Sequence, residues 1–236
     1  MKLESLKSIK IYADGPSVDE IKQLNKDIVE GLTFNPTLFK NLGIKDYLEH
    51  CKNLTNEYSN YPISLEVIAD DYDEMAKQGL KLGKLADNVF VKIPITYTNA
   101  NSTLEVLQYL VSKNIKLNIT AVFTIDQVKE ILPSIKSSKS IISVFSGRLF
   151  DIGLDAVTCT KDISDFVHNS SNCKVLWASP RMVYDIINAI NANCDIITMP
   201  YNLIKKIDLF NKTADDYSLD TVKMFYNDAK KANYKI

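Results

Sequence analysis

Short apolar, β-branched runs alternate along the chain with segments that carry apolar residues at helical spacing. Eight runs predict strands: IKIYAD (9–14), VEGLTF (29–34), ISLEVIA (63–69), NVFVKIPIT (88–96), KLNITAV (116–122), IISVFSGR (141–148), KVLWAS (174–179) and CDIITMP (194–200). Helices are predicted at 18–28, 72–86, 103–113, 125–135 and 181–192, with a terminal helix at 218–232. Ser17, Asp70, Ser102 and Thr124 are the expected helix caps.

This alternation predicts β-α-β units and therefore a parallel sheet. Eight such units in 236 residues fit an α/β fold of one kind closely, a single (β/α)8 TIM barrel over residues 1–236 with an additional C-terminal helix. The alternative is a doubly wound open sheet. Its usual phosphate-binding glycine loop is missing, because the chain has only seven glycines and neither G-x-G-x-x-G nor a Walker loop.

Polar side chains gather on one face of the predicted strands. In NVFVKIPIT, Val89, Val91 and Ile93 share one face, and Lys92 lies on the other. The same parity holds in other strands and places on the inner face Asp14, Asn35, Glu66, Lys92, Asn118, Thr120 and Ser143. Burying so many polar groups costs free energy unless they pair with one another or with a ligand. We therefore expect a site at the carboxyl end of the barrel, where barrel active sites form.

Lys92 has two structural interpretations and one chemical one. It could extend its ammonium group to solvent from a strand end, or it could form a buried ion pair with Glu66. It could also be a Schiff-base lysine, because desolvation lowers an amine's pKa and makes the amine a nucleophile toward a carbonyl. Inward parity and nearby carboxylates favour the chemistry without excluding the ion pair.

Other polar residues complete the candidate site. Asp14 ends the first strand, where it could act as a general base or could only stabilise the turn before Gly15. Glu66 and the Thr120 hydroxyl could hold a water molecule. Arg148 and Arg181 each follow a strand and are phosphate candidates, and Arg181 is expected to open a helix. Either arginine could instead form only a surface ion pair.

Composition argues against several other functions. The net charge of −1 gives no basic field for nucleic acid or for an anionic membrane. The four cysteines form no C-x-x-C pair, and the two histidines, His50 and His168, lie in unpromising contexts, so zinc and Ser-His-Asp chemistry are poor candidates. No apolar run reaches the roughly 18 residues that span a bilayer. No signal peptide is visible in the first residues, so a cytoplasmic location is expected.

At this point the motifs, taken in order, resemble the small-type transaldolases, the group that also contains fructose-6-phosphate aldolase. The resemblance runs from about Ile9 to the C-terminal helix through IYAD, GLTFNP, SLEV, VFVKIPIT, LNITAVF, ISVFSGR, WASPR and DIITMP. Each motif is weak alone, and their shared order is specific. The resemblance implies catalytic roles for Lys92, Asp14, Glu66 and Thr120, and substrate-binding roles for Asn35, Asn118, Ser143, Phe145, Arg148, Ser179 and Arg181.

The resemblance also implies a reaction, the transfer of a dihydroxyacetone unit from a ketose phosphate to an aldose phosphate through a Schiff base on Lys92. It implies no cofactor, no metal, sugar phosphates as the only ligands, a homo-oligomer, and a place in carbohydrate metabolism such as the pentose phosphate pathway. The related aldolases carry Gln where Glu66 stands and Tyr where Phe145 stands, so both residues favour a transferase over a lyase.

Departures from the family pattern leave alternatives open. Phe34, Val144, Trp177 and Pro180 replace the residues usual in these motifs, and Gly-Pro follows Asp14. A specialised transaldolase or aldolase for an unusual sugar, for example in surface-polysaccharide biosynthesis, is therefore one alternative. A barrel that binds a sugar phosphate without catalysis is another. A phosphosugar isomerase is a third, but it needs a base for C1–C2 proton transfer, and no residue is an obvious candidate.

Overall fold

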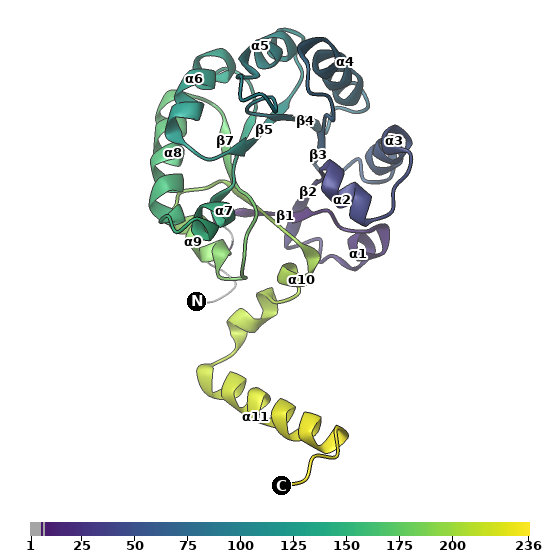
Figure 1. Cartoon of the computed structure of the whole chain (residues 1–236), viewed down its shortest axis with the longest axis vertical. Helices are drawn as coiled ribbons and strands as arrows, with labels where there is room; N and C mark the ends of the chain where they lie inside the picture. Colours follow the sequence, from purple (N-terminus) through teal and green to yellow (C-terminus); the bar gives the residue numbers. More distant parts are fainter. Residues whose placement is uncertain (1–5, 7) are drawn as a thin grey trace.

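The computed structural model describes residue 6 and residues 8–236, and it shows a closed barrel of parallel strands (Figure 1). The strands are β1 (Lys10–Asp14), β2 (Val29–Thr33), β3 (Ile63–Glu66), β4 (Val89–Pro94), β5 (Leu117–Val122), β6 (Ile141–Val144), β7 (Lys174–Trp177) and β8 (Ile196–Met199). Each strand pairs with the next along the chain, and β8 pairs with β1. The predicted (β/α)8 TIM barrel is confirmed.

Helices surround the barrel on its outer side (Figure 1). They are α1 (Val18–Gln23), α2 (Pro36–Asn41), α3 (Tyr47–Glu57), α4 (Tyr72–Gly83), α5 (Leu104–Ser112), α6 (Ile125–Ile135), α7 (Ser146–Asp151), α8 (Ala156–Ser170), α9 (Asp185–Asn191) and α10 (Tyr201–Ile204). A 3-10 turn (Ile207–Asn211) leads to α11 (Ala214–Lys231). No helix of the described residues has the length and apolar character needed to cross a membrane.

Two predicted helices are each five residues shorter than expected. The helix predicted at 18–28 ends at Gln23, because Asn25 forms a turn in which its side chain accepts the Asp27 N–H and its carbonyl accepts the Ile28 N–H. The helix predicted at 181–192 begins only at Asp185. Arg181 therefore does not open a helix, and this prediction was wrong.

The predicted caps are half right. Ser17 and Thr124 each form a capping box. Asp70 does not cap α4, because it accepts hydrogen bonds from Thr98, and the neighbouring Asp71 takes its place. Thr103, not Ser102, is the cap residue of α5.

Two layers of apolar side chains hold the barrel together. The larger core lies between the strands and the helices and includes Val89, Val91 and Ile93 of β4, all nearly inaccessible to solvent. A smaller cluster of Tyr12, Ile141, Leu176, Ala178 and Ile196 is separate from it. Since each of these residues alternates along its strand with members of the larger core, the smaller cluster lies on the inner face.

The last helix stands apart from this core. Figure 1 shows α11 projecting away from the barrel at the end of the α10 segment. No residue of α11 is buried. Its exposed side chains include Tyr217, Leu219, Val222, Met224, Phe225 and Tyr226. α11 therefore presents an apolar surface that the described chain does not cover.

Candidate active site

Strand register places three of the predicted residues in one row. Glu66 of β3 is opposite Lys92 of β4, and Lys92 is opposite Asn118 of β5. The Lys92 Nζ atom lies 3.0 Å from the Glu66 carboxylate, and Lys92 is only 5% exposed. Lys92 therefore does not reach into solvent. The ion pair exists, and it leaves the ammonium group next to a proton acceptor in a desolvated position.

Asp14 lies at the end of β1 and shares this electrostatic environment. The Thr33 hydroxyl donates to the Asp14 carboxylate at 2.7 Å, and it lies 2.5 Å from the Thr198 hydroxyl. Burial raises the pKa of the Asp14 carboxyl above its usual value, while the Lys92 charge and the Thr33 hydrogen bond act in the opposite direction. Ser17, not Asp14, caps α1, so helix capping does not account for this carboxylate.

Asn118 is the centre of a buried hydrogen-bond chain. Its side-chain amide donates to the Ser64 hydroxyl at 3.1 Å and accepts from the Ser143 hydroxyl at 2.6 Å. Strands β3, β5 and β6 are thus joined across the inner face. Asn35 is placed differently: its side-chain oxygen caps α2 by accepting the Leu38 N–H at 2.9 Å. The amide nitrogen of Asn35 takes no part in that cap.

Thr120 lies on the same face of β5 as Asn118 and closer to the carboxyl end, opposite Pro94. Its hydroxyl is buried and has no hydrogen-bond partner among the described residues. The next residue, Ala121, has a φ of 57°, a left-handed conformation that is strained for a residue with a Cβ. The register between β5 and β6 shifts at this position. A bulge at the strand end therefore sets the direction of the chain beside an unsatisfied hydroxyl.

The two candidate phosphate arginines follow β6 and β7. The Arg148 guanidinium lies 5.2 Å from the centre of the Phe145 ring, which also contacts Phe123. Arg181 forms a two-point contact with Asp151, in which Nε donates to Oδ1 at 3.0 Å and Nη2 donates to Oδ2. Since Asp151 is the last residue of α7, which carries Arg148, one short helix connects both arginines.

Helix α7, which carries Arg148, and the loop that carries Arg181 are in close contact. Ser179 has a φ of 61°, and a Cβ added at Gly147 would lie 1.7 Å from the Ser179 carbonyl oxygen. Only glycine therefore permits this approach at position 147. The buried Asp185 carboxylate accepts the N–H groups of Arg181 and Met182 at 2.6 and 3.1 Å. Both ends of the Arg181 residue, its backbone and its guanidinium, are thus fixed by carboxylates.

Sequence reasoning missed several residues that support the site: Ser64, Thr198, Gly147, Asp151 and Asp185. Ser64 has a usable signal, because it shares inward parity with Glu66. Gly147 also has one, because it lies in the FSGR motif. Asp151 and Asp185 have no such signal. Both carboxylates bind Arg181, which is 30 residues from Asp151 and four from Asp185, and nothing in the sequence around either aspartate indicates that contact.

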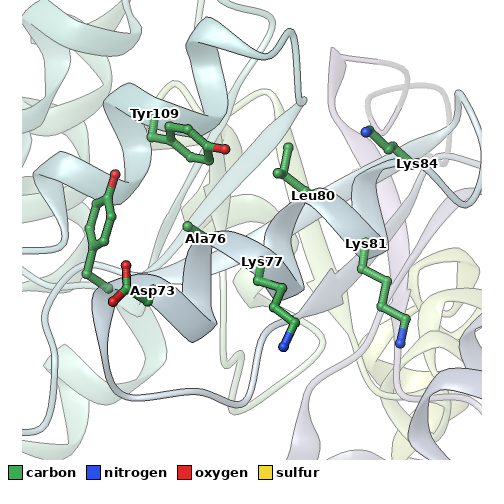
Figure 2. A pocket seen from close by; sticks show the side chains of 8 residues that line it. Asp73, Ala76, Lys77, Leu80, Lys81, Lys84 and Tyr109 are labelled. Carbon is green, nitrogen blue, oxygen red and sulfur yellow. The ribbon is translucent and has the colours of Figure 1, made fainter.

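Two surface hollows lie apart from this arrangement. A hollow of about 510 Å³ between α4 and α5 is lined by Tyr72, Asp73, Lys77, Leu80 and Tyr109, among others (Figure 2). None of its lining residues belongs to the predicted site. A second hollow, of about 760 Å³, is lined by residues that start strands, such as Lys10, Ile141 and Lys174. It therefore lies at the opposite end of the barrel from Asp14 and Glu66.

Comparisons with known proteins agree with the motif order. The family model described as transaldolase/fructose-6-phosphate aldolase matches residues 11–236. A "probable transaldolase" of Ruegeria sp. (strain TM1040) is 34% identical over 230 residues, covering 97% of this chain and all of that protein. Another from Methanococcus maripaludis (strain C7) is 33% identical over 214 residues, covering 90% of this chain and 94% of that protein.

Solved structures add the fold alone. A structure of KGPDC from Streptococcus mutans matches with a TM-score of 0.58 at 11% identity, covering 84% of this chain and 90% of that one. A native KDPGal structure matches with a TM-score of 0.56 at 11% identity and covers 81% of each chain. The whole-length family match and the relatives above 30% identity are decisive: the chain belongs to the transaldolase/fructose-6-phosphate aldolase family.

Proposed function

We propose that this protein is a class I transaldolase that moves a dihydroxyacetone unit from a ketose phosphate, such as fructose 6-phosphate or sedoheptulose 7-phosphate, to an aldose phosphate. The observation that carries the proposal is the buried Lys92–Glu66 pair at 3.0 Å, with the Asp14 carboxyl in its electrostatic field. An ammonium group is not a nucleophile. Glu66 is placed to take its proton, and the free amine can then attack the C2 ketone.

Each step then has a group in place. The Lys92 amine adds to C2, and loss of water from the carbinolamine, assisted by Glu66 and Thr120 through a water molecule, gives an iminium ion. Asp14 takes the proton of the C4 hydroxyl, the C3–C4 bond breaks, and its electron pair moves into an enamine on Lys92. The aldose phosphate leaves and another aldehyde enters. Reversal of these steps forms the new bond, and water releases the product.

The remaining site residues hold the substrate. Asn118 and Ser143 share a hydrogen bond, and Asn35 caps α2 just after the end of β2. These three residues are the proposed ligands of the dihydroxyacetone hydroxyls. Arg148, Ser179 and Arg181 would hold the phosphate, with Phe145 beneath Arg148. The raised pKa of Asp14 supports its role, because a carboxyl with a raised pKa accepts and returns a proton more readily near neutral pH.

The choice between transferase and lyase depends on Phe145. Phenylalanine has no proton to give to the enamine, so the enamine persists until an acceptor aldehyde arrives. A Phe145→Tyr variant should release free dihydroxyacetone from fructose 6-phosphate when no acceptor is present. The wild-type protein should release much less under the same conditions. Equal release by both would favour the alternative, a lyase like fructose-6-phosphate aldolase.

A specialised enzyme for an unusual sugar is the second alternative. Two departures from the family pattern bear on it, because Phe34 and Trp177 are fully buried and pack on Phe39 and Phe150. These bulky residues repack the core, which favours ordinary substrates. The test is transfer from fructose 6-phosphate to erythrose 4-phosphate, followed by the appearance of sedoheptulose 7-phosphate. Failure with this pair and success with another ketose phosphate would support the specialised enzyme.

A non-catalytic barrel that only binds a sugar phosphate would treat Lys92 as a structural ion pair. It predicts that Lys92→Met leaves fructose 6-phosphate binding intact and that the wild type forms no covalent adduct. The transaldolase proposal predicts an adduct in the wild type and none in the variant. Calorimetric titration together with mass spectrometry of both proteins distinguishes these outcomes.

We also propose that the protein is a homo-oligomer, assembled through α11 on a second copy of the chain. The exposed apolar residues of α11 need cover, and its first turn carries Asp215 and Asp216. Lys77 and Lys81 extend from the same side of α4 in Figure 2 and offer the opposite charge, with Lys77 also paired with Glu74 at 3.1 Å. Sedimentation velocity should show a larger assembly for the full chain than for Phe225→Asp. A monomeric full chain would contradict this proposal.

A cytoplasmic location stays a prediction.

A further inference from the structure

Asp151 is the residue of this region that the transaldolase mechanism does not use. Its carboxylate lies at the end of α7 and receives two hydrogen bonds from Arg181, which is 30 residues further along the chain. The Arg181 hydrogen bonds, followed by the charges of Arg181 and Arg148, hold the Asp151 pKa below its usual value. The carboxylate is therefore ionised at neutral pH and faces the pair of arginines proposed to bind phosphate.

We propose that Asp151 is a positioning residue that orients Arg181 for the phosphate group of the substrate. This proposal rests on the function proposed above. Arginine has five N–H donors in a planar fork. Asp151 uses the Nε–Nη2 edge, so the edge formed by Nη1 and the second Nη2 hydrogen stays available for a second two-point contact. Carboxylate and phosphate can then bind the same guanidinium on different edges.

Orientation matters here because the Arg181 side chain is partly exposed. Its relative exposure is 40%, and a free arginine side chain has many rotamers to lose on binding. Asp185 already fixes the Arg181 backbone, so Asp151 fixes the remaining freedom before substrate arrives. Asp151 also repels a phosphate dianion. Salt screens that repulsion at this exposed position, while the two directed hydrogen bonds still hold the plane of the guanidinium.

Arg148 provides an internal contrast. It stacks on Phe145, and no carboxylate of the described residues forms an ion pair with it, whereas Asp151 pairs with Arg181. The two arginines therefore differ: Arg148 has no ion-pair partner among the described residues, and Arg181 has a fixed direction. A site of this kind selects phosphate by charge through Arg148 and by geometry through Arg181. Asp151 should consequently affect phosphorylated substrates and leave their unphosphorylated analogues alone.

The test uses the full-length protein and a ligand that cannot react. Glucitol 6-phosphate has a phosphate and hydroxyl groups but no carbonyl, so its binding does not depend on Schiff-base chemistry. Calorimetric titration at about 0.15 M salt should show about ten-fold weaker binding to Asp151→Asn than to wild type. Asp165→Asn is the matched control, because Asp165 also pairs with a surface cation, Lys161 at 2.5 Å. Its affinity should stay within about two-fold.

A double-mutant cycle shows whether Asp151 acts through Arg181. In an Arg181→Lys background, which cannot form the planar two-point contact, Asp151→Asn should cause almost no further loss. In transfer assays, Asp151→Asn should raise KM for erythrose 4-phosphate about ten-fold, with kcat and the KM for unphosphorylated erythrose unchanged.

Three results would overturn the proposal. One is that Asp151→Asn binds glucitol 6-phosphate as tightly as wild type or more tightly. Another is that Asp151→Asn causes the same loss of affinity in the Arg181→Lys background, and the third is an equal effect on phosphorylated and unphosphorylated acceptors. A wild-type protein that does not bind glucitol 6-phosphate would also contradict the proposal. Failure of the transaldolase proposal looks different, because it would show as the absence of an adduct on Lys92 while the binding of glucitol 6-phosphate persists.

Discussion

Replacing Thr120 by Val separates a structural role of this residue from a catalytic one. Valine has nearly the same shape as threonine, so the variant removes the hydroxyl and little else. That hydroxyl is buried and has no hydrogen-bond partner among the described residues. Removing the hydroxyl therefore leaves no described protein group without its partner, and Thr120→Val should not lower the free energy of unfolding.

Thr103→Val is the matched control. Thr103 is also fully buried, but its hydroxyl donates to the Pro94 carbonyl of β4 at 2.6 Å. Its removal leaves a carbonyl without that partner and should lower the free energy of unfolding by about 1 to 3 kcal/mol. The two variants make the same chemical change on neighbouring parts of the barrel, and only Thr103→Val should lower the free energy of unfolding.

The effects on activity should be the reverse of this, with a loss in Thr120→Val and little change in Thr103→Val. If Thr120 helps a water molecule to dehydrate the carbinolamine, Thr120→Val should slow transfer by about 100-fold or more. Thr103→Val should retain transfer within about a factor of three, because its hydroxyl serves only the backbone. Urea unfolding and initial rates of transfer measure both effects. A Thr120→Val protein that is less stable than wild type, or that keeps its full rate, would refute this reasoning.

Three further predictions concern charged groups. Glu66→Gln removes one charge of the buried Lys92–Glu66 pair, so urea titration should show a free energy of unfolding lower by about 3 kcal/mol. An unchanged free energy of unfolding would show that solvent already stabilises the Lys92 charge. Asp14 has a raised pKa in the folded protein. The protonated carboxyl therefore stabilises the fold below the unfolded pKa of about 3.9, and this contribution is lost as pH rises through the folded pKa. The free energy of unfolding of Asp14→Asn, relative to that of wild type, should increase with pH above about 4, and a decrease would contradict this prediction. His168 pairs with Asp195, which precedes β8 at the amino end of the barrel. His168→Asn should therefore change the transfer rate less than about two-fold, because the proposed site lies at the carboxyl end. A large loss of rate would place catalysis at the amino end instead.

The strands and their inner face could be predicted because both depend on local pattern. All eight predicted runs contain a strand, and parity placed Lys92, Glu66 and Asn118 on one side before register showed them in one row. A barrel strand has only two faces, so an apolar face on one side leaves the polar set to the other. The Lys92–Glu66 ion pair was one of the open interpretations for the same reason.

The arginine region shows where sequence reasoning stops. The prediction that Arg181 opens a helix failed because Asp185, four residues later, uses its carboxylate to accept the N–H groups of the preceding turn. The contact of Arg181 with Asp151 joins the loop after β7 to the end of α7, and it depends on the close approach of Gly147 to Ser179. The bulge at Ala121 likewise has no residue that marks it, because alanine is not a usual choice for a left-handed conformation.

Covalent trapping shows whether Lys92 is a nucleophile. The protein is incubated with fructose 6-phosphate, reduced with borohydride and mapped by peptide mass spectrometry, with Lys92→Ala as the control. A nucleophilic Lys92 should carry a three-carbon dihydroxyacetone adduct, and the variant should carry none. If neither fructose 6-phosphate nor longer or deoxygenated ketose phosphates label Lys92, the Schiff-base mechanism is contradicted, and the 3.0 Å pair with Glu66 is structural.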